Sequence, residues 1–147
     1  MENLTIEQLR NRSYKIPNNL LRKNDNPKLN KHTKIEELKK YWEMHLNLIP
    51  ASISGLNTCG SSSIGCRKAC LHASGNPVFM SQKTLGRTNR TLFYFKERAK
   101  FLSMASKELR NFEILCKKHG LKPVVRLNTT SDIMWENHNL IQTFKNI

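Results

Sequence analysis

The clearest hydrophobic pattern in the chain is a stripe of apolar side chains at helical spacing in its second half. The stripe predicts one long helix from about Leu92 to about His119, which Gly120 would end as a left-handed C′ residue. Its members are Leu92, Phe95, Ala99, Leu102, Ala105, Leu109, Phe112 and Cys116. Since Cys116 lies on the stripe, we expect it to be a core thiol. The opposite face is expected to be solvated, because it carries Lys96, Lys100, Lys107, Arg110 and Lys117.

Shorter patterns predict further elements along the chain. Thr33 and Glu36 form a capping box that would open a helix, and His45 would lie at the edge of that helix rather than in a site. Apolar runs, one of them rich in β-branched residues, predict strands. The expected elements are helices at about 34–46 and 78–85, a short helix at 5–10, and strands at 46–52 and 121–128.

The first part of the chain has no sustained hydrophobic period. Asparagine and proline interrupt the pattern between residues 13 and 31, so a loop is expected there, with strand-like fragments around Ile16 and Leu29. We therefore predict a basic, irregular N-terminal segment at residues 1–33 and an α/β domain at residues 34–147.

The order strand, helix, strand predicts an α/β fold built of parallel βα units with a right-handed crossover. In such folds the residues that follow the carboxyl ends of strands face the ligand. Arg126, Asn128, Ser131 and Asp132 end or follow the second strand and are candidate catalytic residues. The alternative is that Ser131 or Asp132 caps the next helix. Loops that follow parallel strands are expected to meet at one sheet edge.

The loop that follows the first strand carries three of the four cysteines, Cys59, Cys66 and Cys70, among glycines and serines. Thiols on such a loop indicate a metal or a cluster in a reducing compartment. Simple buried thiols are the alternative. A disulfide is disfavoured because three is an odd number and the chain shows no secretory signal.

Zinc and an iron–sulfur cluster are both compatible with these thiols. Zinc requires a fourth ligand, for which His72 is the nearest candidate, and the spacing is not that of a zinc knuckle. A cluster can use three thiolates and keep one iron open. The spacing slightly favours the cluster. Arg87 and Arg90 lie further along among small polar residues, where they would hold a phosphate or carboxylate of a cofactor or form a charged connector.

The composition is unusual in its charge: the 147 residues carry a formal net charge of +14. Such a surplus predicts attraction to polyanions, nucleic acid above all, although an AT-rich coding genome would also enrich lysine. No apolar run is long enough for a membrane span, and the N-terminus has no apolar signal region. The sequence therefore predicts a cytoplasmic protein without a membrane partner.

Several stretches, in order from about residue 26 to 136, resemble the bacteriophage gene product 88 family. The most specific are the cysteine loop that ends Cys70-Leu-His-Ala-Ser-Gly and the block Arg126-Leu-Asn-Thr-Thr-Ser-Asp-Ile-Met-Trp-Glu. The other matching stretches are 26–31, 48–52, 90–95 and Val125. The resemblance implies a phage- or plasmid-encoded protein in a bacterial host, and it implies little about mechanism.

The arrangement is also similar, more distantly, to radical S-adenosylmethionine enzymes. These place a three-cysteine cluster loop after the first strand of a partial (β/α) barrel. Cys66 and Cys70 match the first half of their motif, but its third cysteine would fall at Ala73, so Cys59 would take that role. The resemblance implies S-adenosylmethionine as a possible second cofactor. Since the chain reaches Ile147 inside an apparent new helix, either a truncated barrel or a smaller α/β layer is expected.

Two functions from different classes follow from the sequence. One is an iron–sulfur protein or enzyme with Arg126, Asn128 and Asp132 around its substrate. The other is a zinc-stabilised basic protein that binds nucleic acid.

Overall fold

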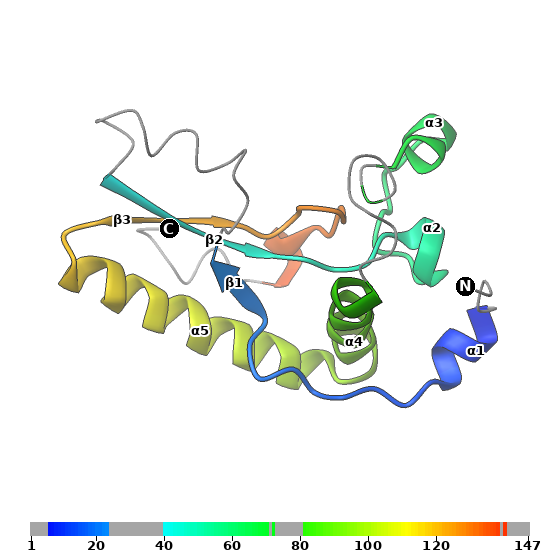
Figure 1. Cartoon of the computed structure of the whole chain (residues 1–147), viewed down its shortest axis with the longest axis horizontal. Helices are drawn as coiled ribbons and strands as arrows, with labels where there is room; N and C mark the ends of the chain where they lie inside the picture. The colour runs from blue at the N-terminus through cyan, green and yellow to red at the C-terminus, as the bar shows by residue number, and fades with distance from the viewer. Residues whose placement is uncertain (1–5, 24–39, 71, 73–80, 139, 141–147) are drawn as a thin grey trace. The chain divides into compact units, whose positions relative to one another are not determined.

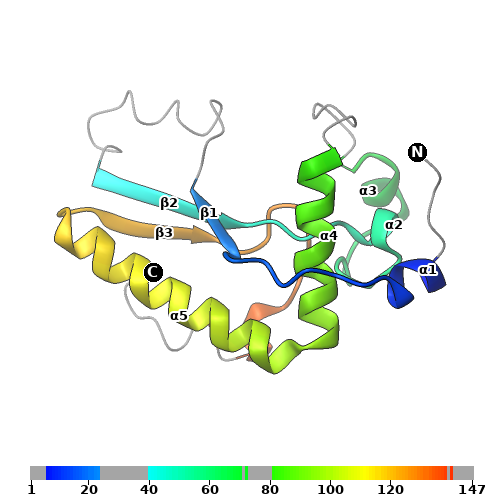
Figure 2. The ribbon, with the colours of Figure 1, turned by 60° about the horizontal axis from the view of Figure 1, so that its bottom comes forward.

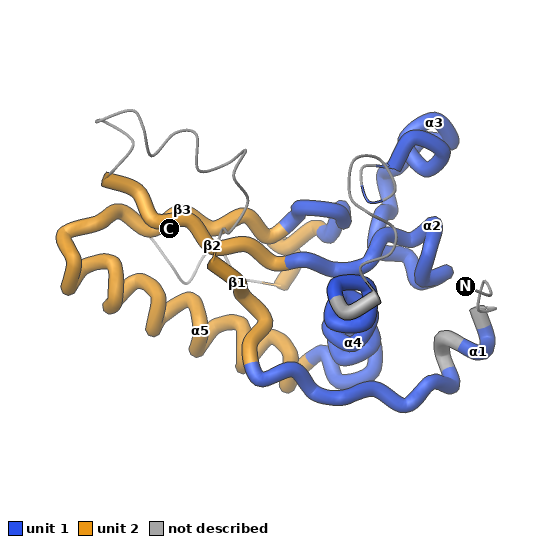
Figure 3. The backbone as a smooth tube through the Cα atoms, in the orientation of Figure 1, with its two compact units in different colours: residues 1–18, 47–98, 128–133 blue, residues 19–46, 99–127, 134–147 orange. Residues whose placement is uncertain are grey.

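The computed structural model describes residues 6–23, 40–70, 72, 81–138 and 140. These residues form two compact units that are interleaved in sequence (Figure 3). Unit 1 comprises residues 1–18, 47–98 and 128–133, and unit 2 comprises residues 19–46, 99–127 and 134–147. The predicted boundary between residues 33 and 34 lies outside the described residues.

Unit 2 contains a mixed three-stranded sheet with the order β1-β2-β3 (Figure 1). Strand β1 (Leu21–Lys23) runs antiparallel to β2 (Tyr41–Leu46), and β3 (Lys122–Arg126) runs parallel to β2. Helix α5 (Arg98–Lys118) extends along one face of the sheet (Figure 2). The expectation of an α/β fold with a parallel strand pair is therefore confirmed. Strand β1 is an addition, because it lies in a segment that was predicted to be a loop.

The helix predicted at 34–46 is wrong over its last six residues, which form β2. Residues 34–39 lie outside the described residues. Trp42 packs edge-to-face against Phe112 of α5, with 6.0 Å between ring centroids, while Tyr41 on the opposite face is exposed. The side chains of β2 therefore alternate between the two faces of the sheet instead of repeating at helical spacing. Pairing of β2 with β1 on one edge and β3 on the other overrides the weak local preference for a helix.

The predicted long helix is two helices. Helix α4 (Ser81–Lys96) belongs to unit 1, and α5 begins at Arg98 after a break at Glu97. The second half of the predicted stripe is correct, since Ala105, Leu109, Phe112 and Cys116 are all buried. Its middle is not, because Ala99 is exposed and Phe95 and Leu102 are only half-buried. Phe101, which the stripe omitted, is fully buried instead.

Gly120 ends α5 as predicted. Its φ of 65° is left-handed, its N–H donates to the carbonyl of Lys117, and the N–H of Leu121 donates to the carbonyl of Cys116 at 2.9 Å. This pair of bonds is a Schellman motif, which pairs carbonyls of the last helical turn. The motif turns the chain directly into β3.

The strand predicted at 46–52 is not formed beyond Leu46. Pro50 is the N-cap of a short helix, α2 (Ala51–Ser54), and residues 47–50 have no strand partner. Threonine side chains bond to this segment instead: Thr91 Oγ1 accepts from Ile49 N–H at 2.9 Å, and Thr58 Oγ1 donates to the Ile49 carbonyl at 2.9 Å. Buried backbone groups must be paired, and here side chains perform the role of a neighbouring strand.

The N-terminal part of unit 1 contains the predicted short helix, α1 (Ile6–Asn11). Beyond it, Ile16 is exposed and lies in no strand, and Leu29 is outside the described residues. Tyr14 stacks on Phe93 and donates its hydroxyl to Glu97, which raises the pKa of Tyr14 to about 12. No helix in the described part of the chain is long and apolar enough to cross a membrane.

Candidate functional site

The cysteine loop of unit 1 is organised by its own serines. Ser63 caps the short helix α3 (Ile64–Lys68) by accepting a hydrogen bond from Cys66 N–H at 3.1 Å. Ser62 donates its hydroxyl to the Cys59 carbonyl at 2.7 Å and accepts from Arg67 Nε at 2.9 Å. The expected helical turn is therefore present at Cys66, but α3 ends two residues before Cys70.

The four cysteines divide into three accessible thiols and one core thiol. Cys66 is exposed, Cys59 and Cys70 are half-buried, and none of the four forms a disulfide. Cys116 is fully buried in unit 2, and burial raises its pKa, so the prediction of a core thiol is confirmed. Among the described residues, no three His, Cys, Asp or Glu side chains are grouped closely enough to hold a metal ion.

The cysteine loop meets the loop at 128–133, as the order of the elements predicted. Cys59 and Asp132 form an isolated parallel β-bridge, in which Asp132 N–H donates to the Thr58 carbonyl at 2.7 Å. The Cys59 thiol lies 3.9 Å from the Thr130 carbonyl. Both loops belong to unit 1, so this meeting is a property of one compact unit.

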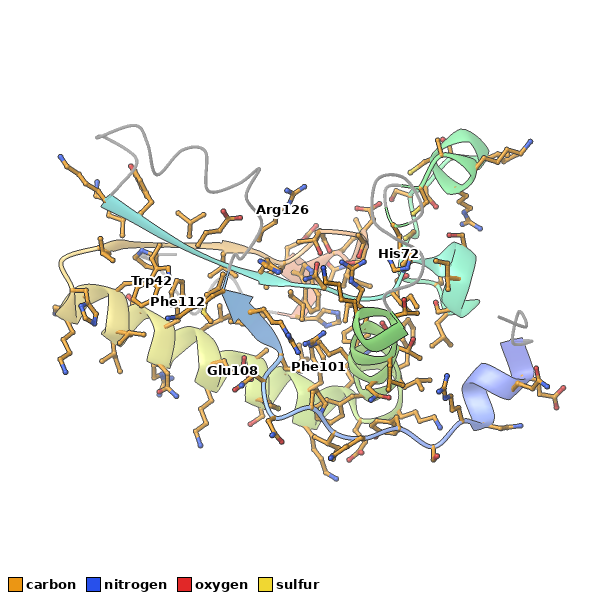
Figure 4. The ribbon with its side chains drawn as sticks, viewed as in Figure 1. Trp42, His72, Phe101, Glu108, Phe112 and Arg126 are labelled. Carbon is orange, nitrogen blue, oxygen red and sulfur yellow. The ribbon has the colours of Figure 1, made fainter. Side chains whose placement is uncertain are left out.

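The candidate residues after β3 have different surroundings. Asn128 braces its own loop, accepting from Ile133 N–H at 3.1 Å and donating to the Ile133 carbonyl at 2.9 Å. Ser131 donates to Asn128 Oδ1 at 3.2 Å instead of capping a helix. Asp132 has an exposed side chain beside Cys59. Arg126 lies on β3 in unit 2 and points away from α5 (Figure 4). Asp132 is thus the exposed candidate whose backbone is paired with that of a loop cysteine.

His72 is held by Arg87, whose guanidinium nitrogen lies 2.6 Å from His72 Nδ1. Because a guanidinium only donates, Nδ1 accepts and the proton of the neutral imidazole is on Nε2. Desolvation and the adjacent positive charge of Arg87 both lower the pKa of His72, and desolvation lowers that of Arg87. In this arrangement His72 offers no free lone pair to a metal.

Arg87 and Arg90 do not lie on a connector, because the segment 86–91 is part of α4. Arg90 is 4% exposed and Arg87 is half-buried, so both guanidinium groups are largely removed from water. Helical spacing places these residues on neighbouring positions of one face. Pattern analysis could not anticipate this burial, because Gly86 and the polar neighbours are typical of a loop.

The residues that sequence reasoning missed are threonines. Besides Thr58 and Thr91, Thr130 Oγ1 donates to the Leu48 carbonyl at 2.6 Å, and Thr129 donates to Asn47 Oδ1. These bonds attach both loops to the segment 47–50. The available signal was a threonine next to apolar or cysteine residues, as in Leu56-Asn-Thr-Cys59.

Replacing Thr91 with valine is expected to destabilise the protein by about 1–3 kcal/mol, because it leaves the buried Ile49 N–H without an acceptor. Urea unfolding measures the change. Thr88→Val is the matched control: Thr88 is also buried, at 5% exposed, and among the described residues its hydroxyl bonds to the Thr84 carbonyl, which the helix ladder already uses. Equal losses in the two variants would show that Thr91 does not brace the loop.

Comparison with protein families matches residues 19–147 of the chain to the family described as Gene product 88. The match includes the cysteine loop, the loop at 128–133 and all three strands. No curated protein and no solved structure matches the chain. A match over residues 19–147 covers most of the chain, and the chain therefore belongs to the gene product 88 family.

Proposed function

We propose that the protein binds a metal centre, an iron–sulfur cluster, through Cys59, Cys66 and Cys70. The observation that carries the proposal is the division of the thiols: the three on the loop are accessible, whereas Cys116 is fully buried. Thiolates are the preferred ligands of such clusters, and a bacterial cytoplasm would keep them reduced. We therefore place the protein in the cytoplasm of a bacterial host.

Binding would require the loop to close on the metal. Cys66 lies in α3 and Cys70 just beyond its end, so one further turn of helix would bring the two thiols to one face. Cys59 is anchored by its bridge to Asp132 and would provide a fixed point for the other two. Metal binding is coupled to folding, so the free energy of binding would order the loop.

The His72–Arg87 contact supports a cluster over zinc. Metal-bound histidines usually donate their second N–H to a carboxylate or carbonyl, whereas Nδ1 of His72 faces a cation. Without His72, three thiolates leave one position open, which is typical of a cluster with an accessible iron and leaves zinc incompletely held. A molecule bound at that open position would lie near the exposed Asp132.

We further propose that the chain forms part of a partial barrel of the radical S-adenosylmethionine type. It is supported by the parallel pairing of β2 with β3 and by the two candidate loops, each of which follows one of these strands in sequence. The half-buried Arg87 and the buried Arg90 would then be candidates for the carboxylate of that cofactor.

Metal analysis of the full chain purified without oxygen tests the proposal. We expect iron and sulfide to be bound, with absorbance near roughly 400 nm. Cys59→Ser, Cys66→Ser and Cys70→Ser should each abolish the cluster, because each removes one of its thiolates. Cys116→Ala is the control and should leave iron content unchanged, since that thiol lies in the core of unit 2. Equal iron loss in Cys116→Ala would contradict the assignment.

The variant His72→Ala distinguishes an iron–sulfur cluster from a zinc site. If a cluster is bound by three thiolates, this variant should retain its iron and sulfide. Zinc in the purified protein, no colour, and loss of that zinc in His72→Ala would instead show a Cys3His site. That result would replace the cluster by the zinc alternative.

A further inference from the structure

The face of the sheet opposite α5 carries a row of basic side chains in unit 2. The register pairs Arg22 of β1 with His45 of β2, and His45 with Arg126 of β3. Residues paired across strands project to the same face, so these three side chains form a line across the whole sheet. Arg22 and Arg126 are exposed and lie about 10 Å apart, two strand spacings.

The same face also offers aromatic and apolar surface next to these charges. Tyr41 is 39% exposed and Val124 is 40% exposed, and Lys122 Nζ lies 5.7 Å from the centre of the Tyr41 ring. Among the described strand residues, the carboxylate on this face is Glu43, which lies beside Val124. The exposed charges of the face nevertheless remain net positive.

α5 covers only the other face of the sheet. Trp42 and Phe112 point toward each other between the sheet and α5, whereas Arg126 points the opposite way (Figure 4). Alternation along β2 and β3 thus separates an apolar side, which packs on α5, from a basic side with an accessible ring. A sheet face that combines exposed arginines with an exposed aromatic ring has the chemistry to hold phosphates and to stack on bases.

We propose that this face, defined by Arg22, Tyr41, His45, Lys122 and Arg126, binds single-stranded nucleic acid. The arginines would contact phosphates, and Tyr41 would stack on a base. A single strand is favoured over a duplex because only unpaired bases present a π-face to Tyr41. The net charge of +14 attracts nucleic acid to the protein in general, and the register of the three strands places basic side chains together on this face. The proposal is independent of the metal centre.

Fluorescence anisotropy of a labelled oligothymidine of about 20 nucleotides tests the proposal on the full chain. Arg22→Gln/Arg126→Gln should weaken binding about tenfold or more at about 50 mM salt. The slope of log K against log salt should fall by about 1.4, because each phosphate contact to a single strand contributes about 0.7. Tyr41→Val should weaken binding about tenfold through the loss of base stacking.

Lys107→Gln/Arg110→Gln is the charge-matched control. Both residues are exposed on α5, which lies on the other side of the sheet, so this variant should bind within about twofold of the unchanged protein. Equal weakening in the two double variants would show diffuse charge attraction and overturn the proposal. Absence of binding at low salt, or a duplex of equal length bound as tightly as the single strand, would also overturn it.

Discussion

Replacing Phe101 with alanine is expected to lower the free energy of unfolding by about 3–5 kcal/mol. Phe101 is fully buried in unit 2, where its ring stacks on Trp135 with 6.4 Å between centroids and 15° between planes. Trp135 belongs to the 3-10 helix η3 (Trp135–His138) and is itself 2% exposed. Removing the ring would leave a cavity between α5 and η3, and the packing of Trp135 would be lost with it.

Urea or thermal unfolding measures this change, which corresponds to a fall of roughly 10 °C in Tm. Leu102→Ala is the matched control on the next residue of the same helix. The apolar stripe places Leu102 in the core and omits Phe101, whereas the structure leaves Leu102 half-buried. Leu102→Ala should therefore cost only about 1–2 kcal/mol. A larger loss at Leu102 than at Phe101 would contradict the arrangement of α5.

Replacing Glu108 with alanine is expected to cost about 2–4 kcal/mol. The Glu108 carboxylate on α5 accepts from Leu20 N–H at 2.8 Å and 3.1 Å and from Leu21 N–H at 2.8 Å. Leu20 and Leu21 are buried, so alanine would leave two backbone donors without partners at the start of β1. Bonds to a charged acceptor are among the stronger hydrogen bonds in proteins, which makes the loss large.

Two further variants define the role of Glu108. Glu108→Gln retains one carbonyl oxygen and should give an intermediate loss in urea unfolding. Glu136→Ala removes an exposed carboxylate from the same unit and should change stability by less than about 0.5 kcal/mol. If Glu108→Ala were as mild as Glu136→Ala, the carboxylate would not be what holds β1.

Much of the chain could be predicted because the relevant signals are local. Gly120 follows a helical stripe, and only a left-handed residue closes the Schellman motif. The β-branched run formed β3, and Cys116 is buried because it shares the stripe with Leu109 and Phe112. The meeting of Cys59 with Asp132 followed from a topological rule: loops after parallel strands share an edge.

The elements that pattern analysis missed depend on partners distant in sequence. Strand β2 pairs with β3, some 80 residues away, and its alternation is too short to outweigh an apparent helical period. The threonine bonds to residues 47–50 come from 58, 91, 129 and 130. A threonine beside apolar or cysteine residues is a local signal of burial, but it does not indicate which distant segment the side chain bonds to.

The sequence by itself therefore determined the three-thiol loop, the core thiol and the family, because spacing and composition encode these features. Only the tertiary structure decided three others: that His72 faces Arg87, that Glu108 anchors β1, and that Arg22, His45 and Arg126 align across the sheet. Each of these is a contact between residues 15 or more positions apart in the chain, and tertiary packing and strand pairing, not residue order, bring them together.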